Sequence, residues 1–164
     1  IGGHQERGRR GGTEAVPLII GLGTAARLAR EHLPDEQTRV RALRDRLERT
    51  LTERIPSTRV NGHAEQRLPN TSNISFEHVE GEAILLMMSD LGIAASSGSA
   101  CTSGSLEPSH VLRAMGVSYT FAHGSIRFSL SRYTTDEDVD HVIASMPPII
   151  ARLREISPFW KRIA

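Results

Sequence analysis

The sequence predicts an α/β fold in which helices cover one face of a sheet, and two observations support this prediction. Residues 73–77 and 125–130 alternate polar and apolar side chains, as half-buried strands do. Around these segments, apolar residues recur at spacings of three and four, which is typical of amphipathic helices. Residues 1–33 differ from this pattern, and we expect them to be an appendage to the α/β layer.

Two helices are predicted in the first third of the chain. Apolar residues are so frequent over 16–33 that we expect this helix to be buried on more than one face. Thr13 is placed to cap its start, and Pro34 is expected to end it. Asp35 can cap a second helix that reaches about Arg54. The apolar stripe of the second helix consists of Val40, Leu43, Leu47 and Leu51.

Strands and short helices are predicted in the middle of the chain. A strand around Val60 precedes the turn formed by Asn61 and Gly62. After the strand at 73–77, a helix over 80–91 is expected to lead into a short apolar strand over 93–95.

Two more helices are predicted in the last third of the chain. Pro108 suits the first turn of a short helix. Thr135 and Asp138 form a weak capping box at the start of a longer helix. We expect that helix to kink at Pro147 and Pro148.

Composition limits the classes of function. The chain has 164 residues and a formal net charge of +1, so it offers no overall basic field for nucleic acid. It has no apolar run of the roughly 20 residues that span a membrane, and no apolar signal-peptide segment at its start. The single cysteine excludes an internal disulfide framework and a Cys-rich metal site. A reducing, cytoplasmic setting without metal catalysis fits this composition best.

Cys101 is the first candidate for chemistry. A lone cysteine is usually a small, inert core residue. Its neighbours here are Ser, Gly, Ala and Thr, and glycines at positions 98 and 104 flank it. This composition indicates an exposed loop that can move rather than a packed core. A thiolate on such a loop could attack or deliver a ligand atom.

Arg127 and Thr13 are the next candidates. Arg127 is predicted on the polar face of its strand, where a guanidinium suits bidentate binding of a carboxylate; a structural salt bridge is the alternative. Thr13 follows a glycine- and arginine-rich segment, and a hydroxyl at a helix start can bind an anion. It can equally be an N-cap without a ligand.

The lysine and the histidines of the chain offer no good candidates for a Schiff base or a metal site. The only lysine, Lys161, is the fourth residue from the end of the sequence and is a poor candidate for a Schiff base, which needs a closed pocket. The seven histidines show no metal-ligand spacing. Glycines crowd the first twelve residues as they do between two ordered elements, so we expect the chain to be a piece of a longer protein.

Four segments resemble the group I cysteine desulfurases of the NifS/IscS type. The longest is the run SSGSACTSGSLEPSHVL at 96–112, which is similar to their active-site loop. The others are GGHQERGRRGGTE at 2–14, VEGEA at 79–83 and SIRFSLSRYTT at 125–135. The amino-acid sequence of the run at 96–112 most closely resembles that of the nitrogen-fixation (NifS) type.

The resemblance implies the fold of the PLP-dependent aspartate-aminotransferase-like (fold type I) transferases. Residues 1–33 would be a helical remnant of the large PLP-binding domain. Residues 34–164 would be the small C-terminal α/β domain, with the catalytic cysteine loop at 96–106. The chain would then be the C-terminal portion of such an enzyme.

The resemblance also implies an activity and partners. The complete enzyme would use pyridoxal phosphate to convert L-cysteine to L-alanine, with a persulfide formed on Cys101 for iron–sulfur cluster assembly. Arg127 would hold the substrate carboxylate. Thr13 would reach the cofactor phosphate of the other subunit of a homodimer, and an iron–sulfur scaffold protein would accept the sulfur.

The chain departs from this family because it lacks the Schiff-base lysine. We therefore expect the chain alone to be inactive, since the cofactor is the electron sink that weakens the C–S bond. Two alternatives from other classes are a non-enzymatic sulfur-carrier or interaction module and a cofactor-free thiol peroxidase, whose Cys101 would form a sulfenic acid with peroxide.

Overall fold

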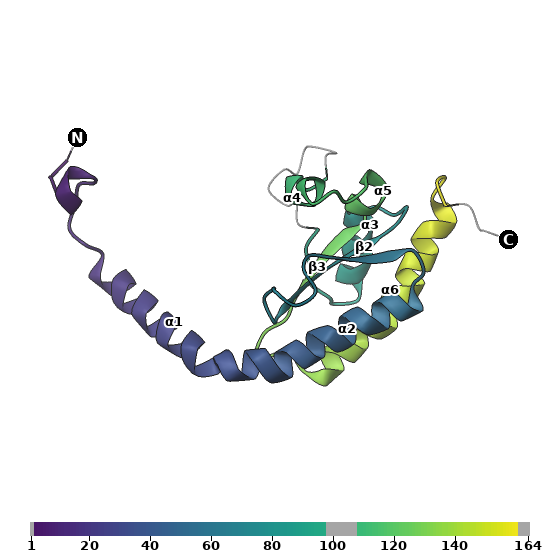
Figure 1. Cartoon of the computed structure of the whole chain (residues 1–164), viewed down its shortest axis with the longest axis horizontal. Helices are drawn as coiled ribbons and strands as arrows, with labels where there is room; N and C mark the ends of the chain where they lie inside the picture. Colours follow the sequence, from purple (N-terminus) through teal and green to yellow (C-terminus); the bar gives the residue numbers. More distant parts are fainter. Residues whose placement is uncertain (1, 98–107, 161–164) are drawn as a thin grey trace. The chain divides into compact units, whose positions relative to one another are not determined.

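The computed structural model describes residues 2–97 and 108–160. The chain divides into two compact units, Ile1–Pro34 and Asp35–Ala164. Each unit is described by itself, and Figure 1 labels their helices and strands.

The first unit contains a short 3-10 helix, η1 (Glu6–Gly8), and the helix α1 (Val16–Asp35), which ends one residue into the second unit. Residues 2–31 are exposed, so the expectation that this helix is buried on more than one face is wrong for the described chain. Thr13 does not cap the helix either. The backbone N–H groups of Leu18 and Ile19 donate to the carbonyl of Ala15, and α1 begins at Val16, three residues beyond Thr13.

Pro34 does not end the helical backbone, contrary to the sequence prediction. It lies inside α1, and a π-helical turn, η2 (Glu36–Val40), leads directly into α2 (Arg41–Arg54). Such a widened turn accommodates a residue that cannot donate the regular α-helical hydrogen bond. Asp35 is not a cap, because its carboxylate oxygens accept hydrogen bonds from Nε and NH2 of Arg39, both at 3.0 Å.

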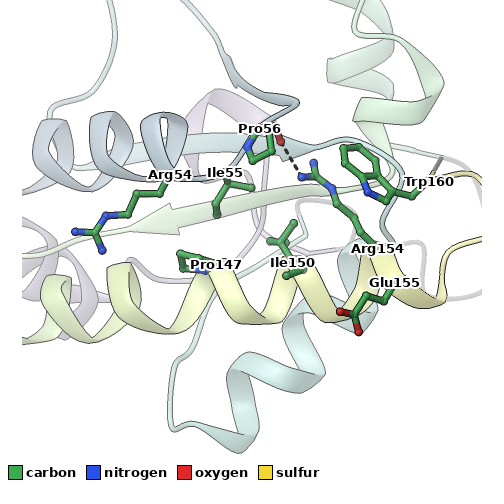
Figure 2. Close-up of a pocket in the computed structure, with 9 residues that line it drawn as sticks. Arg54, Ile55, Pro56, Pro147, Ile150, Arg154, Glu155 and Trp160 are labelled. Atoms are coloured by element: carbon green, nitrogen blue, oxygen red, sulfur yellow. Dashed lines mark hydrogen bonds between the residues drawn. The ribbon is translucent and has the colours of Figure 1, made fainter. Parts of the chain in front are cut away.

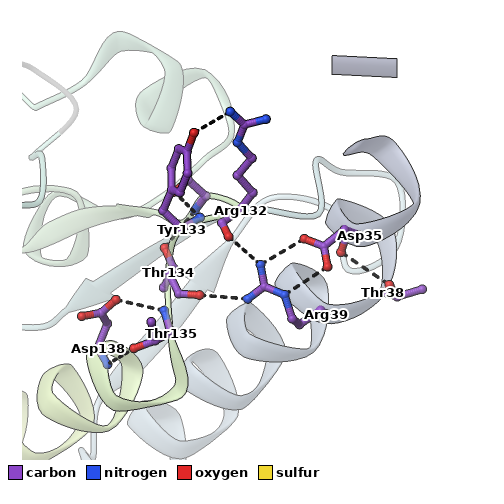
Figure 3. A network of polar contacts seen from close by, with 9 residues as sticks. Asp35, Thr38, Arg39, Arg132, Tyr133, Thr134, Thr135 and Asp138 are labelled. Atoms are coloured by element: carbon purple, nitrogen blue, oxygen red, sulfur yellow. Dashed lines mark hydrogen bonds and ion pairs between the residues drawn. The ribbon is translucent and has the colours of Figure 1, made fainter. Parts of the chain in front are cut away.

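Arg39 also fastens η2 to the loop before the last helix, as Figure 3 shows. Its NH1 donates to the carbonyl of Thr134 at 2.9 Å, and its NH2 donates to the carbonyl of Arg132 at 2.8 Å. The hydrogen bonds to Asp35 raise the pKa of Arg39. These hydrogen bonds therefore connect the first residues of the second unit to the loop that precedes α6.

Three antiparallel strands form one sheet in the order β1-β2-β3: β1 (Thr58–Asn61), β2 (Thr71–Phe76) and β3 (Ser125–Ser129). The helices that follow β2 are α3 (Gly81–Asp90), α4 (His110–Ala114), α5 (Tyr119–Ala122) and α6 (Asp136–Ile156). The predicted α/β class is confirmed. The predicted strand over 93–95 is wrong, since only Ser96 makes an isolated bridge there.

The core lies between the sheet and the helices α2 and α6, which run side by side in Figure 1. Ile74 and Phe76 of β2 and Ile126 and Phe128 of β3 point into it. The predicted stripe of α2 is buried as expected and consists of Val40, Leu43, Leu47 and Leu51. At the surface, Arg46 of α2 contacts the carboxylates of Asp136 and Asp140 of α6.

The helix α6 confirms one of the two predictions made for it. Thr135 and Asp138 form the predicted capping box, with reciprocal hydrogen bonds of 3.2 and 2.9 Å. Pro147 and Pro148 lie inside α6, which runs without interruption over Asp136–Ile156, and a kink at these two residues stays a prediction. None of the helices in the described part of the chain combines the length and the apolar character needed to cross a bilayer.

Candidate active site

Arg127 stands at the centre of the candidate site. Its strand neighbours Ile126 and Phe128 are buried in the core, so alternation places Arg127 on the opposite face of the sheet. Its side chain is exposed. Among the residues that the structure describes, the guanidinium has no hydrogen bond and no ion pair, and the alternative of a structural salt bridge therefore finds no support there.

The segment that leads to Cys101 begins at this arginine. Ser96 and Arg127 form an antiparallel bridge. The backbone N–H of Arg127 donates to the carbonyl of Ser96 at 2.6 Å, and the N–H of Ser96 donates back at 3.2 Å. Cys101 itself lies outside the described residues. The structure thus fixes the origin of the cysteine-bearing segment beside the candidate carboxylate-binding residue.

Two glycines allow backbone segments to approach one another closely near Ser96 and Arg127. A Cβ on Gly81, at the start of α3, would lie 3.0 Å from the carbonyl oxygen of His123 and 3.4 Å from Cβ of Ser97. A Cβ on Gly124 would lie 2.0 Å from the carbonyl oxygen of Phe76, which no side chain tolerates. Glycine is therefore required at position 124 for β2 to approach the start of β3.

Sequence reasoning missed a row of polar residues on the same face of the sheet. The register pairs Asn61 of β1 with Asn73 of β2, and Asn73 with Arg127 of β3. Directly paired residues of antiparallel strands share a face. The alternation of β2 was a signal that Asn73 faces away from the core. No local signal gives the register that aligns it with Arg127.

Thr13, the third predicted site residue, belongs to the first unit. It is exposed, and its hydroxyl has no hydrogen bond among the described residues. Its assignment to a cofactor phosphate stays a prediction.

Two cavities lie elsewhere on the second unit. One of about 410 Å³ is largely apolar and is bordered by His123, whose Nδ1 lies 3.4 Å from a carboxylate oxygen of Glu80. The other, of about 690 Å³, contains Arg154 and Trp160 and is shown in Figure 2. The described residues include no group of three His, Cys, Asp or Glu side chains that could hold a metal ion.

A family model describes most of this chain. The class-V aminotransferase model matches residues 3–142. The chain belongs to the class-V aminotransferase family. Members of this family use pyridoxal phosphate, and the family has the fold type I architecture that the sequence resemblance implies.

Within this family, the chain is similar in sequence to cysteine desulfurases. A protein named cysteine desulfurase from Gluconacetobacter diazotrophicus is 72% identical over 97% of this chain, and the cysteine desulfurase NifS of Azotobacter vinelandii is 62% identical over the same share. The resemblance predicted from the motifs is confirmed. This class-V aminotransferase chain spans 40% of the length of both relatives.

Solved structures agree with this similarity. A NifS-like protein is 35% identical, with a TM-score of 0.77, over 93% of this chain and 38% of its own. A NifS-like protein from Rickettsia africae is 33% identical, with a TM-score of 0.78, over 92% of this chain and 39% of its own.

The described residues fit pyridoxal phosphate only in part. The exposed guanidinium of Arg127, which has no partner among the described residues, suits an anionic substrate group. The hydroxyl of Thr13, which makes no hydrogen bond to those residues, suits a phosphate oxygen. A lysine is needed to bind the cofactor aldehyde, and residues 2–97 and 108–160 contain none. No chemical step can therefore be derived through the cofactor from this chain alone.

Proposed function

We propose that this chain is the C-terminal part of a cysteine desulfurase that converts L-cysteine to L-alanine and leaves the sulfur as a persulfide on Cys101. Bound pyridoxal phosphate, held by a lysine from the rest of the protein, would supply the electron sink that weakens the substrate C–S bond. The carboxylate of L-cysteine binds to Arg127.

One observation carries this proposal: the bridge between Ser96 and Arg127. Cys101 follows Ser96 by five residues, and five extended residues span at most about 18 Å. The chain connection thus keeps Cys101 within about 18 Å of Ser96, the residue bonded to Arg127. Within the described part of the chain no carboxylate pairs with the guanidinium of Arg127, which favours its availability for that ligand.

The chemistry of Cys101 is a sulfur transfer. Its thiolate attacks the sulfur of the bound cysteine, and an S–S bond forms as the substrate C–S bond breaks. The substrate carbon keeps the electron pair of that bond and takes up a proton, which gives alanine. Sulfur leaves the enzyme when a second thiol attacks the persulfide.

The wider setting belongs to the same proposal. The complete protein would be a cytoplasmic homodimer in which Thr13 reaches the cofactor phosphate of the other subunit. An iron–sulfur scaffold protein would accept the sulfur, and the role would be in nitrogen fixation. The names of the relatives, cysteine desulfurase and cysteine desulfurase NifS, support the class of enzyme on which this wider setting rests.

Replacement of Cys101 tests the proposal. In the complete enzyme, Cys101→Ala should abolish persulfide and alanine formation, because no thiolate remains to attack the substrate sulfur. L-Alanine should still bind as a competitive ligand with unchanged affinity, because its carboxylate site is intact. Persulfide is measured by mass spectrometry of the intact protein and alanine by amino-acid analysis.

The control is Ser105→Ala, a similar truncation in the same segment, which should keep most of the activity. Alanine production at the normal rate by Cys101→Ala would refute the assignment of Cys101. Sulfur acceptance by the wild-type protein from an added donor, without consumption of cysteine, would instead support a carrier module.

A further inference from the structure

The pairing of Arg127 with Asn73 brings their side chains close together. Both backbone groups of Arg127 are bonded to Ser96, on the side of β3 that faces away from β2. Arg127 and Asn73 therefore form a non-hydrogen-bonded pair, in which the Cα atoms lie about 4.5 Å apart and the side chains approach most closely. The two side chains also share the face of the sheet that points away from the core.

The amide of Asn73 is held in one orientation. Nδ2 of Asn61 donates hydrogen bonds to Oδ1 of Asn73 and to Oγ of Ser75, both at 2.7 Å. The oxygen of Asn73 is thus engaged on the side of β1. Its own Nδ2, which carries two N–H donors, makes no hydrogen bond to any residue that the structure describes.

Asn61 is arranged to hold this orientation. It is only 6% exposed, and its Oδ1 is buried without a hydrogen-bond partner within the described part of the chain. A buried carbonyl oxygen without a donor is unfavourable. The opposite orientation of the Asn61 amide would leave two donors unpaired in place of one acceptor. The amide NH2 therefore points at Asn73 and Ser75.

We infer that Asn73 is a second binding residue for the carboxylate of the amino-acid substrate, and that Asn61 is its positioning residue. The Nδ2 group of Asn73 donates to one carboxylate oxygen while the guanidinium of Arg127 binds the carboxylate as its ionic partner. Asn61 keeps the oxygen of Asn73 turned away from the anion, where it would be repelled. This inference rests on the proposed function, because it assumes that Arg127 binds a carboxylate.

A purely structural role is the competing explanation. In that case Asn61 and Asn73 only join β1 to β2, and their loss would affect every ligand equally. The two explanations separate when each ligand is compared with its amide, which has the same shape but no carboxylate. L-Cysteine is compared with L-cysteinamide as a substrate, and L-alanine with L-alaninamide as a competitive ligand.

The test uses the complete enzyme with Asn73→Ala. Loss of a hydrogen bond to a charged group should lower kcat/KM for L-cysteine and raise the inhibition constant of L-alanine roughly 10-fold or more. Both constants should change several-fold less for the two amides, because their neutral carbonyl oxygen accepts a weaker hydrogen bond than a carboxylate does. Asn73→Asp should be worse than Asn73→Ala for L-alanine, because it adds a like charge beside the carboxylate.

Asn61→Ala provides the positioning test. It should weaken L-alanine binding less than Asn73→Ala does, and it should have no further effect when Asn73 is already Ala. The matched control is Ser129→Ala, which removes an exposed side chain from the same face of β3 two residues after Arg127 and should behave as wild type. If Asn73→Ala does not fold, Asn73→Thr takes its place, because threonine favours strands.

Failure of the inference can be told from failure of the proposed function. If Arg127→Ala loses the preference for L-alanine over L-alaninamide but Asn73→Ala keeps it in full, the role of Arg127 stands and that of Asn73 is refuted. If Arg127→Ala also keeps the preference, the carboxylate site of the proposed function is refuted, and the inference with it. Equal losses for carboxylates and amides in Asn73→Ala establish the structural role and overturn the inference.

Discussion

Arg154 shows how one buried residue joins three segments of the second unit. It is 4% exposed. Its guanidinium donates to the carbonyls of Glu77 at 3.2 Å, Pro56 at 2.8 Å and Ser57 at 3.1 Å. The ring of Trp160 covers it at 4.1 Å, and Figure 2 shows both groups within the larger cavity. Burial lowers the pKa of Arg154, so these carbonyls stabilise a charge that has lost most of its water.

Replacement of Arg154 should therefore destabilise the chain. Arg154→Met leaves three carbonyls without their donor, and we expect a loss of about 3 kcal/mol in the free energy of unfolding. The matched control is Arg152→Met on the same helix, whose exposed side chain pairs with Glu155 at 3.2 Å and with no other described residue. That variant should change stability by less than about 0.5 kcal/mol. Urea denaturation of the 164-residue chain measures both, and equal midpoints would contradict the role given to Arg154.

At the scale of elements, the start of α6 concentrates acidic groups where a helix favours them. Asp136, Glu137 and Asp138 occupy its first turn. A hydrogen bond from its own backbone N–H, followed by one from the hydroxyl of Thr135, lowers the pKa of Glu137 below its ordinary value of 4.5. The ionised carboxylate of Glu137 therefore stabilises the helix start.

The lowered pKa of Glu137 predicts that the stability of the chain depends on pH. Because the folded-state pKa of Glu137 is depressed, its contribution is complete above about pH 4.5 and is lost as the pH falls through the folded-state value. Glu137→Gln should thus be less stable than wild type at pH 7, and the two should converge in acid. Thr135→Val, which removes one of the two donors, should reduce the pH dependence in part. Unfolding midpoints from pH 7 to pH 3 test this, and a difference that is constant with pH would contradict it.

The elements that the sequence predicted correctly are those with a local signal. The strands near residues 73–77 and 125–130 follow from alternation, and the capping box of Thr135 needs a partner only three residues away. The continuation past Pro34 depends on contacts such as those of Arg39 with a loop more than 90 residues later, which periodicity cannot report. The alignment of Asn73 with Arg127 likewise depends on a register between distant strands.

At the scale of the whole molecule, α1 exposes its apolar side chains throughout. Leu18 is 74% exposed and Leu22 is 73% exposed. Helices of this apolar character are stable in proteins when another surface covers them. The chain also spans only 40% of the length of its cysteine desulfurase relatives. Both facts support the proposal that the rest of a longer protein completes this unit and supplies the cofactor lysine.

The same reasoning predicts that the isolated 164-residue chain has no desulfurase activity. With L-cysteine and added pyridoxal phosphate, it should release neither alanine nor sulfide, because its described residues include no lysine to bind the cofactor. The complete enzyme is the positive control. Lys161, the only lysine of the chain, gives a matched variant. Lys161→Ala should leave the complete enzyme fully active, since its cofactor lysine lies elsewhere. Alanine release by the isolated chain that disappears in Lys161→Ala would instead identify Lys161 as the residue that binds the cofactor.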